Sequence, residues 1–214
     1  VGYVQYKNIL EFDLGFNTEN ILNIDMQGNN PELLLKELEE MPEITEVSRS
    51  VIVTSVGNAW GGYMKYNDSS DSVLVMTNNV DENYLSLHDY KLLAGGNFIT
   101  RPMTANAVSE VIVNQQVLKR FNIGDQDPEK AIGKEITFSN VQGRERRMTI
   151  VGVIKDFHYG KVNNLIEPVA LMFWTPENPS VINAKIQTND VLATMAKIES
   201  RWRKIDPVHA FQAK

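Results

Sequence analysis

The sequence predicts an α+β fold in which the two chain ends together form a two-layer α/β subdomain, with a mainly-β subdomain inserted between them. Near each end, the order strand, amphipathic helix, strand recurs, and a proline follows each helix directly. The middle of the chain carries short β-type runs separated by turn signals. A β-α-β unit cannot bury its apolar face alone, so we expect the two end units to share one sheet. The expected boundaries are residues 1–56 and 180–214 for the α/β subdomain and 57–179 for the insertion.

The N-terminal unit begins with a strand over residues 20–26, where apolar and polar residues partly alternate. A helix follows, with Asn30 as N-cap and Pro31 at its first position. Its apolar residues recur at i, i+4 and i+7 and are Leu34, Leu38 and Met41. Pro42 ends the helix, and a second strand is predicted over residues 47–53.

The C-terminal unit repeats this order. A strand over residues 181–188 leads to Asp190, which is predicted to cap a helix. Five apolar side chains at steps of four and three predict a single buried stripe on this helix, namely Val191, Met195, Ile198, Trp202 and Ile205. Pro207 ends the helix, and residues 208–213 are expected to start another strand.

The insertion is predicted to be rich in strands. Six runs have β character: Tyr63–Tyr66, Ser72–Thr77, Glu110–Asn114, Glu135–Ser139, Met148–Ile154 and Val169–Trp174. Gly61-Gly62, Asn78-Asn79, Gly95-Gly96 and Gln142-Gly143 are expected to form turns between them. Two short helices are predicted over residues 82–88 and 114–121.

Composition excludes several classes of function. The chain has 214 residues and a net charge of -6, and its basic residues are scattered, with the densest cluster at Arg144, Arg146 and Arg147. Nucleic acid and an anionic membrane surface are therefore poor partners. No cysteine is present, which excludes disulfides, thiolate metal sites and a cysteine nucleophile. No run of 18 apolar residues predicts a membrane helix, and we expect both ends to be internal to a longer protein.

Candidate chemical residues are few. His158 follows Asp156 directly after an apolar strand, but neither a second histidine nor clustered carboxylates lie at metal-ligand spacing, so a turn that bonds local backbone is the favoured interpretation. His88 and His209 have no identifiable partner. The glycine-rich stretch 57–62 precedes a strand rather than a helix, which argues against a phosphate loop. Trp60 and Tyr63 beside it are candidates for an exposed contact surface. The sequence thus predicts no catalytic, cofactor or metal residue.

The stretch Met148–His158 resembles the VxGVxxDFH segment of MacB-like periplasmic core domains, found in FtsX-like ABC transporter permeases of the Bacteroidota type. Further resemblances follow the same order as in that family and span nearly the whole chain: Asp13–Asn17, Glu19–Ile21, Lys91–Phe98, Val111–Asn114 and Ile166–Pro168. Two positions depart from the pattern, since Gln115 stands where Glu is usual and Gly96 where Arg is frequent.

This resemblance implies a porter-like α/β subdomain built from both chain ends and an inserted Sabre-like subdomain. It also implies a parent permease at the bacterial inner membrane, with one membrane helix before this domain and three after it. The domain would face the periplasm. Its partners would be a cytoplasmic ABC ATPase, a second permease copy and a periplasmic adaptor or transported substrate. It would couple ATP-driven helix motion to export, lipoprotein transport or regulation of cell-wall hydrolases, without catalysis and without a cofactor.

Two other classes stay open. An extracytoplasmic ligand-sensing domain would need a concave apolar pocket with a few polar groups. A hydrolase or metalloenzyme would need a convergent set of titratable groups, and loss of activity on replacing His158 would be its sign. We rank the second class last.

Overall fold

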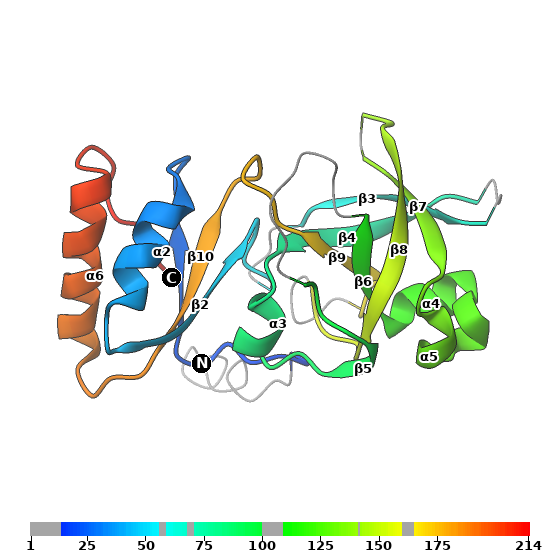
Figure 1. The fold of residues 1–214 in the computed structure, drawn as a ribbon, viewed down its shortest axis with the longest axis horizontal. Coiled ribbons are helices and arrows are strands. Elements are labelled where there is room, and N and C mark those ends of the chain that lie inside the picture. The colour runs from blue at the N-terminus through cyan, green and yellow to red at the C-terminus, as the bar shows by residue number, and fades with distance from the viewer. Residues whose placement is uncertain (1–13, 56–58, 68–70, 100–108, 141, 160–164) are drawn as a thin grey trace, which may run out of the picture.

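The computed structural model describes residues 14–55, 59–67, 71–99, 109–140, 142–159 and 165–214. The molecule is elongated, with helices α2 (Pro31–Glu39) and α6 (Val191–Ile205) at one end and a strand-rich body at the other (Figure 1). A ten-stranded sheet runs through both parts. The predicted α+β class is confirmed.

The α/β end holds three antiparallel strands in the order β1 (Ile21–Asp25), β10 (Val181–Ile186) and β2 (Ile44–Ser50). Segments from the two chain ends therefore lie side by side, as the sequence predicted. The side chains that α2 and α6 bury include Leu34, Leu38, Ile198 and Trp202, which are fully enclosed. The apolar residues of β1, β2 and β10 join the same core cluster.

Both predicted helix caps are present. The side chain of Asn30 accepts a hydrogen bond from the backbone N of Glu32 at 3.0 Å, and that of Asp190 accepts from Ala193 N at 2.9 Å. The predicted stripe of α6 is wrong at Val191, which is 59% exposed. Residues 191–193 all lie at the surface, so the first turn of α6 projects beyond its packing partners, and Thr194 is the first buried residue.

The strand predicted over residues 208–213 is replaced by a turn and one isolated bridge between Ile24 and Ala213. The side chain of Asp206 accepts hydrogen bonds from the backbone N of Val208 and His209 at 3.0 and 2.9 Å, which holds the turn. The last residues then reach β1, where Asn23 N donates to Lys214 O at 2.8 Å.

The strand-rich body contains all six predicted strands. These are β3 (Gly61–Tyr66), β4 (Val73–Val80), β6 (Glu110–Asn114), β7 (Glu135–Ser139), β8 (Glu145–Ile154) and β9 (Val169–Phe173). They follow the order β4-β3-β7-β8-β6-β9, and a parallel pairing of β4 with β9 closes the ring. We call these six strands the barrel. The sequence did not predict β5 (Leu92–Gly95), which pairs with β8, nor the helical turns η1 (Ile123–Gln126) and α5 (Pro128–Ala131).

The predicted short helices are present as α3 (Tyr84–Leu87) and α4 (Gln115–Phe121). Two predicted turns are wrong, because Asn78-Asn79 lies inside β4 and Gly61-Gly62 opens β3. A Cβ atom on Gly62 would lie 2.3 Å from the Phe138 ring, so close packing rather than a turn requires glycine there.

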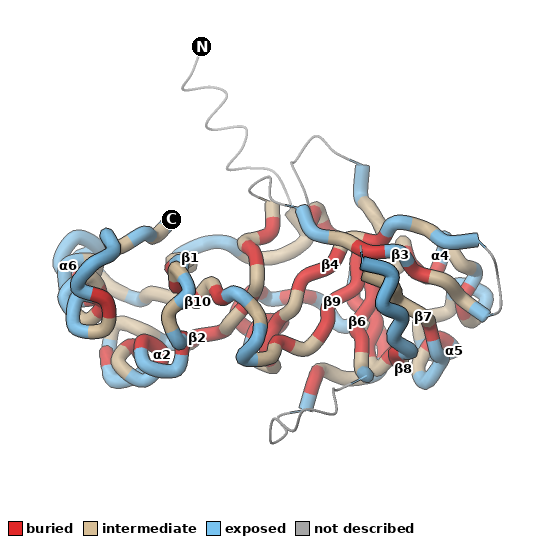
Figure 2. The backbone as a smooth tube through the Cα atoms, turned by 90° about the horizontal axis from the view of Figure 1, so that it is seen from above, coloured by how far each residue is buried: buried red, intermediate tan, exposed pale blue. Residues whose placement is uncertain are grey.

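The buried apolar residues divide between the two ends of the molecule. One cluster draws its members from residues 22–47 and 182–213, whereas two others draw theirs from the barrel and from segments packed on it. Figure 2 shows the buried backbone running through β4, β6 and β9, while α6 presents an exposed outer face. The subdomain boundary at residues 56/57 and 179/180 stays a prediction.

Candidate functional site at the junction of the two halves

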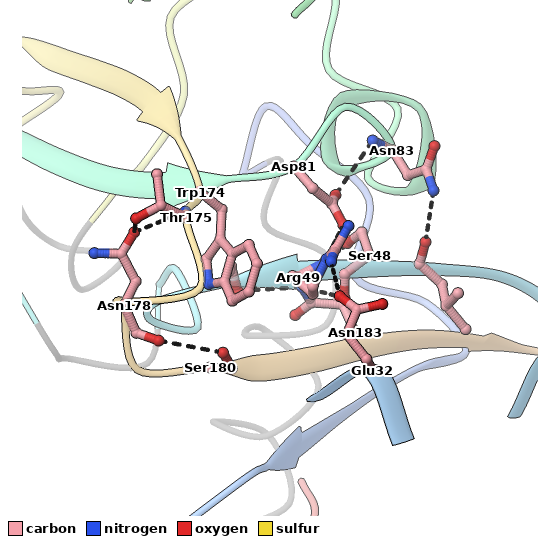
Figure 3. A network of polar contacts seen from close by, with 12 residues as sticks. Glu32, Ser48, Arg49, Asp81, Asn83, Trp174, Thr175, Asn178, Ser180 and Asn183 are labelled. Atoms are coloured by element: carbon pink, nitrogen blue, oxygen red, sulfur yellow. Dashed lines mark hydrogen bonds and ion pairs between the residues drawn. The ribbon is translucent and has the colours of Figure 1, made fainter. Parts of the chain in front are cut away.

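The two halves meet at a polar junction centred on Arg49 of β2. Its backbone N and its Nε both donate to Oδ2 of Asp81, at 2.7 and 3.1 Å. Its guanidinium also pairs with Glu32 of α2 and lies over the Trp174 ring, 4.7 Å from the centroid (Figure 3). One side chain therefore links α2 and β2 to the ends of β4 and β9.

Asp81 is the buried charge of this junction, with 2% of its surface exposed. Burial raises the pKa of its carboxyl to about 6, although the hydrogen bonds from Arg49 act in the opposite direction. The carboxylate thus depends on Arg49 for compensation, and removing Arg49 would leave an uncompensated buried charge.

Side-chain amides form hydrogen bonds between the halves where the backbone ladder of β2 and β4 ends. Strands β2 and β4 share the registered pair Ser50–Val80, and no further pair of these two strands is registered in the described part of the chain. Nδ2 of Asn83, which precedes α3, donates to Val47 O of β2 at 3.2 Å. Nδ2 of Asn78 donates to Ile52 O at 3.1 Å. Polar side chains therefore carry much of the contact between the halves.

A second contact is made by residues 14–19, which we call the N-terminal segment. The backbone N of Asn17 donates to His88 O at 2.7 Å, and Nδ1 of His88 lies 2.9 Å from Asn17 O. Nδ2 of Asn17 donates to Oδ2 of Asp89 at 2.9 Å. The backbone N of His158 donates to Leu14 O at 2.8 Å. The segment is thereby fixed to α3 and to the loop after β8.

Phe16 anchors this segment in an aromatic socket, which we define as Tyr84, His88, Tyr90 and Phe157. Its ring stacks on Tyr90, with 5.0 Å between centroids and 7° between planes, and meets Phe157 edge-on at 5.8 Å. Gly15 makes the approach possible, because its φ of 84° and a Cβ only 2.9 Å from Cα of Phe157 exclude other residues.

In the Asp-Phe-His motif at residues 156–158, the aspartate and the phenylalanine stabilise the fold. Oδ1 of Asp156 accepts from the backbone N of Gln116 at 3.0 Å, and Oδ2 lies 3.5 Å from Nζ of Lys119, so the carboxylate fixes the first turns of α4. Phe157 is fully buried. The favoured sequence interpretation placed the partner of Asp156 in its own turn, whereas the structure places it 40 residues earlier in the chain.

The remaining candidates separate into different places. His88 is 4% exposed, and burial lowers its pKa to about 4. His209 pairs with Asp206 through Nδ1 and Oδ2 at 2.7 Å, at the end of α6. Within the described residues, no three His, Asp or Glu side chains gather as a metal would require. Residues 57 and 58 of the glycine-rich stretch lie outside the described residues.

Trp60 and Tyr63 are 57% and 48% exposed, and Leu74, which is registered opposite Tyr63, is 48% exposed. A contact role for this surface stays a prediction. Sequence reasoning missed Arg49, Asp81 and Phe16 as junction residues. The sequence offered two signals for them, namely a lone arginine inside a strand, Arg49, and an aromatic residue next to a glycine, Phe16.

Comparisons with known proteins agree with this architecture. The model of the MacB-like periplasmic core domain family matches residues 5–201. The periplasmic region of MacB from Actinobacillus actinomycetemcomitans is similar in structure, with a TM-score of 0.62, 15% identity and coverage of 97% of this chain and 93% of that one. A domain of a protein described as a permease from Porphyromonas gingivalis has a TM-score of 0.59 and 14% identity, covering 95% and 91%.

The extracellular domain of the ABC-type transporter YknZ from Gram-positive bacteria has a TM-score of 0.57 and 12% identity, covering 91% of this chain and 100% of that one. Among curated proteins, none matches this sequence. In the part of the chain that the structure describes, no helix is long and apolar enough to cross a bilayer. The family match spans most of the sequence, and the chain belongs to the family of MacB-like periplasmic core domains.

Proposed function

We propose that this domain is a non-catalytic mechanical module, which transmits ATP-driven movement of permease membrane helices to a substrate or partner in the periplasm. The parent permease would work with an ABC ATPase and a second permease copy. The observation that carries this proposal is the attachment of the two described ends to different halves of the molecule. A relative movement of the two ends would then act on the junction between the halves.

The two attachments differ in their partners. The N-terminal segment is fixed to α3 and to the loop after β8, both of which belong to the barrel half. The last residues pair with β1 of the α/β half, where Lys214 N donates to Asn23 O at 3.0 Å. We propose that the two halves are separate subdomains, with boundaries at residues 56/57 and 179/180. The core cluster of the α/β half draws its residues from 22–47 and 182–213, inside these boundaries, whereas Phe16, Val51 and Ile52 cross them to pack on the barrel cluster.

A disulfide across the junction tests the proposal in the intact permease. Ser50 and Val80 are registered antiparallel neighbours, whose Cα atoms are about 5 Å apart in such pairs, within the range of disulfides. The domain has no native cysteine, so a Ser50→Cys, Val80→Cys double variant introduces one defined link. Oxidation should abolish transport, and reduction should restore it.

A matched link inside the barrel serves as control. Thr137 and Arg147 are registered neighbours on β7 and β8, and a disulfide between them stays within one half. Transport should persist in this variant and in the single-cysteine variants. Unchanged transport in the oxidised junction variant would contradict the mechanical proposal.

A ligand-sensing function is the second candidate, and one feature favours it. A shallow open groove of about 490 Å³ beside α3 is lined by Leu85, Tyr90 and Leu92 together with Asp89 and Lys91. Its volume falls in the range of small-molecule sites, although its mixed polar lining is atypical of them. A compound that raised the thermal unfolding temperature of wild type, but not of a Leu92→Arg variant, would favour sensing over mechanical transmission.

A further inference from the structure

A small cavity lies where the N-terminal segment, β1, β10 and α3 meet. Its volume is about 20 Å³, which is room for one water molecule. Apolar parts of its wall come from Phe16, Ile21 and Val53, and polar side chains come from Thr18, Asn23, Thr54, Tyr84, His88 and Asn183. No charged residue lines it.

His88 presents a hydrogen-bond acceptor to this cavity. Its Nδ1 lies 2.9 Å from the carbonyl oxygen of Asn17, which can only accept, so Nδ1 carries the proton. Burial keeps the imidazole neutral by lowering its pKa to about 4. Nε2 is then an unprotonated acceptor, and no group of the described residues donates to it although the atom is fully enclosed.

Asn23 presents a second acceptor. Its Nδ2 donates to the backbone oxygen of Lys214 at 3.4 Å, which sets the orientation of the amide. Its Oδ1 is enclosed and has no donor among the described residues. A buried acceptor without a donor is costly, so two enclosed acceptors on residues that line one cavity point to a shared donor.

We propose that the cavity binds one water molecule, which donates one hydrogen to Nε2 of His88 and the other to Oδ1 of Asn23. Water supplies two donors within the volume of a single site. The hydroxyl pair of Thr54 and Tyr84, whose oxygens are 2.9 Å apart, offers a further polar partner on the same wall. The bound water joins α3 of the barrel half to β1 of the α/β half.

A metal ion fits this cavity less well than water. Zinc and copper accept imidazole nitrogen, but their protein sites add further nitrogen, thiolate or carboxylate ligands. The lining has a single imidazole and no carboxylate. An ion there would remain without charge compensation in a largely apolar wall.

A crystal structure of the domain at high resolution tests the proposal directly. We expect electron density for one water about 2.7–3.2 Å from both Nε2 of His88 and Oδ1 of Asn23. Solution NMR of the ¹⁵N-labelled domain should show the Nδ1-protonated tautomer of His88, and a long-lived water should give cross-relaxation with protons of its ring. An empty cavity, or direct contact between the two side chains, would overturn the proposal.

Two variants sharpen the result. Asn23→Leu removes one acceptor and leaves the imidazole in place, so the water signal at His88 should disappear while the tautomer stays the same. His209→Gln removes a surface imidazole and should leave the His88 signals unchanged. Addition of Zn²⁺ should also leave them unchanged. A zinc-induced shift of the His88 Nε2 resonance would replace the water by a metal site and overturn the proposal.

Discussion

The N-terminal and C-terminal attachments hold the molecule by different means. Phe16 enters an aromatic socket built from residues about 70 and 140 positions away, and the hydrogen bonds around it involve the side chains of Asn17, His88 and Asp89. The C-terminal residues lie against β1 through backbone hydrogen bonds, with Phe211 at 6.2 Å from the Trp202 ring. The first attachment therefore depends on particular side chains, whereas the second depends mainly on the strand ladder.

The largest expected effect is a loss of stability that is confined to one of the two halves. Trp202 is fully buried in the core cluster of the α/β half, so Trp202→Ala should lower the free energy of unfolding of that half by about 3–5 kcal/mol. Since the clusters share no residue, hydrogen exchange should accelerate in β1, β2 and β10, while β6 and β8 keep their protection.

Ile150→Ala is the matched variant in the barrel, because Ile150 is also fully buried. It should reverse the pattern of protection. Equal loss of protection in both halves, in either variant, would show one cooperative unit and would remove the proposed subdomain boundary.

The buried imidazole of His88 predicts a pH dependence at the junction. Its pKa is about 6.5 in the unfolded chain and about 4 in the folded one, so between these pH values the unfolded state binds more protons. Stability is therefore lost as pH falls from 6.5 to 4, by about 3 kcal/mol from this group. Urea unfolding of wild type and His88→Gln at several pH values should show this loss as the pH-dependent difference between the two proteins.

The same loss should be absent in His88→Gln and retained in His209→Gln. Asp81 contributes in the opposite direction, because its raised pKa of about 6 adds stability on acidification from 6 to 3.8. That contribution is common to all three proteins, so it cancels in the comparison. Parallel curves for wild type and His88→Gln would contradict the assignment of a neutral buried imidazole.

A direct test of the two attachments compares two partly buried phenylalanines. Phe16→Ala should destabilise the domain by about 2 kcal/mol, because it empties part of the aromatic socket. Phe211→Ala should cost about 1 kcal/mol, since its nearest ring, that of Trp202, is 6.2 Å away and the backbone bonds remain. Thermal unfolding of both variants gives the ranking. A larger loss for Phe211→Ala would reverse the comparison.

The sequence predicted helices better than the junction for a physical reason. The caps Asn30 and Asp190 and the prolines after each helix act over a few residues, so local pattern was sufficient. Asparagine favours turns, so the sequence predicts a turn at Asn78, but the residue lies in β4 and its amide donates to Ile52 O across the junction.

A local turn and a set of long-range contacts account for the other differences from the predicted structure. The strand expected after α6 does not form, because Asp206 accepts hydrogen bonds from the backbone N of Val208 and His209. The alternation of apolar residues gives no sign of this turn. The role of Phe16 depends on Tyr90 and Phe157, and no spacing rule links residues that far apart. The family resemblance marked the segments 13–17 and 148–158 without indicating that they pack together.

The smallest expected effect concerns a charge pair that crosses the junction. Nζ of Lys185 on β10 lies 3.9 Å from Oδ2 of Asp89 beside α3, and both side chains are partly exposed. Lys185→Ala should therefore change the free energy of unfolding by no more than about 0.5 kcal/mol.

The charge of Lys185 also lowers the pKa of His88, so that pKa should rise in the variant. An NMR titration of the His88 ring protons measures this shift. Lys197→Ala, which removes a lysine of α6 paired with Glu43, is the control and should leave the His88 titration unchanged. If both variants left it unchanged, β10 and α3 would not sense each other electrostatically, and the coupling between the halves would reside in the hydrogen-bonded contacts of Arg49 and of the N-terminal segment alone.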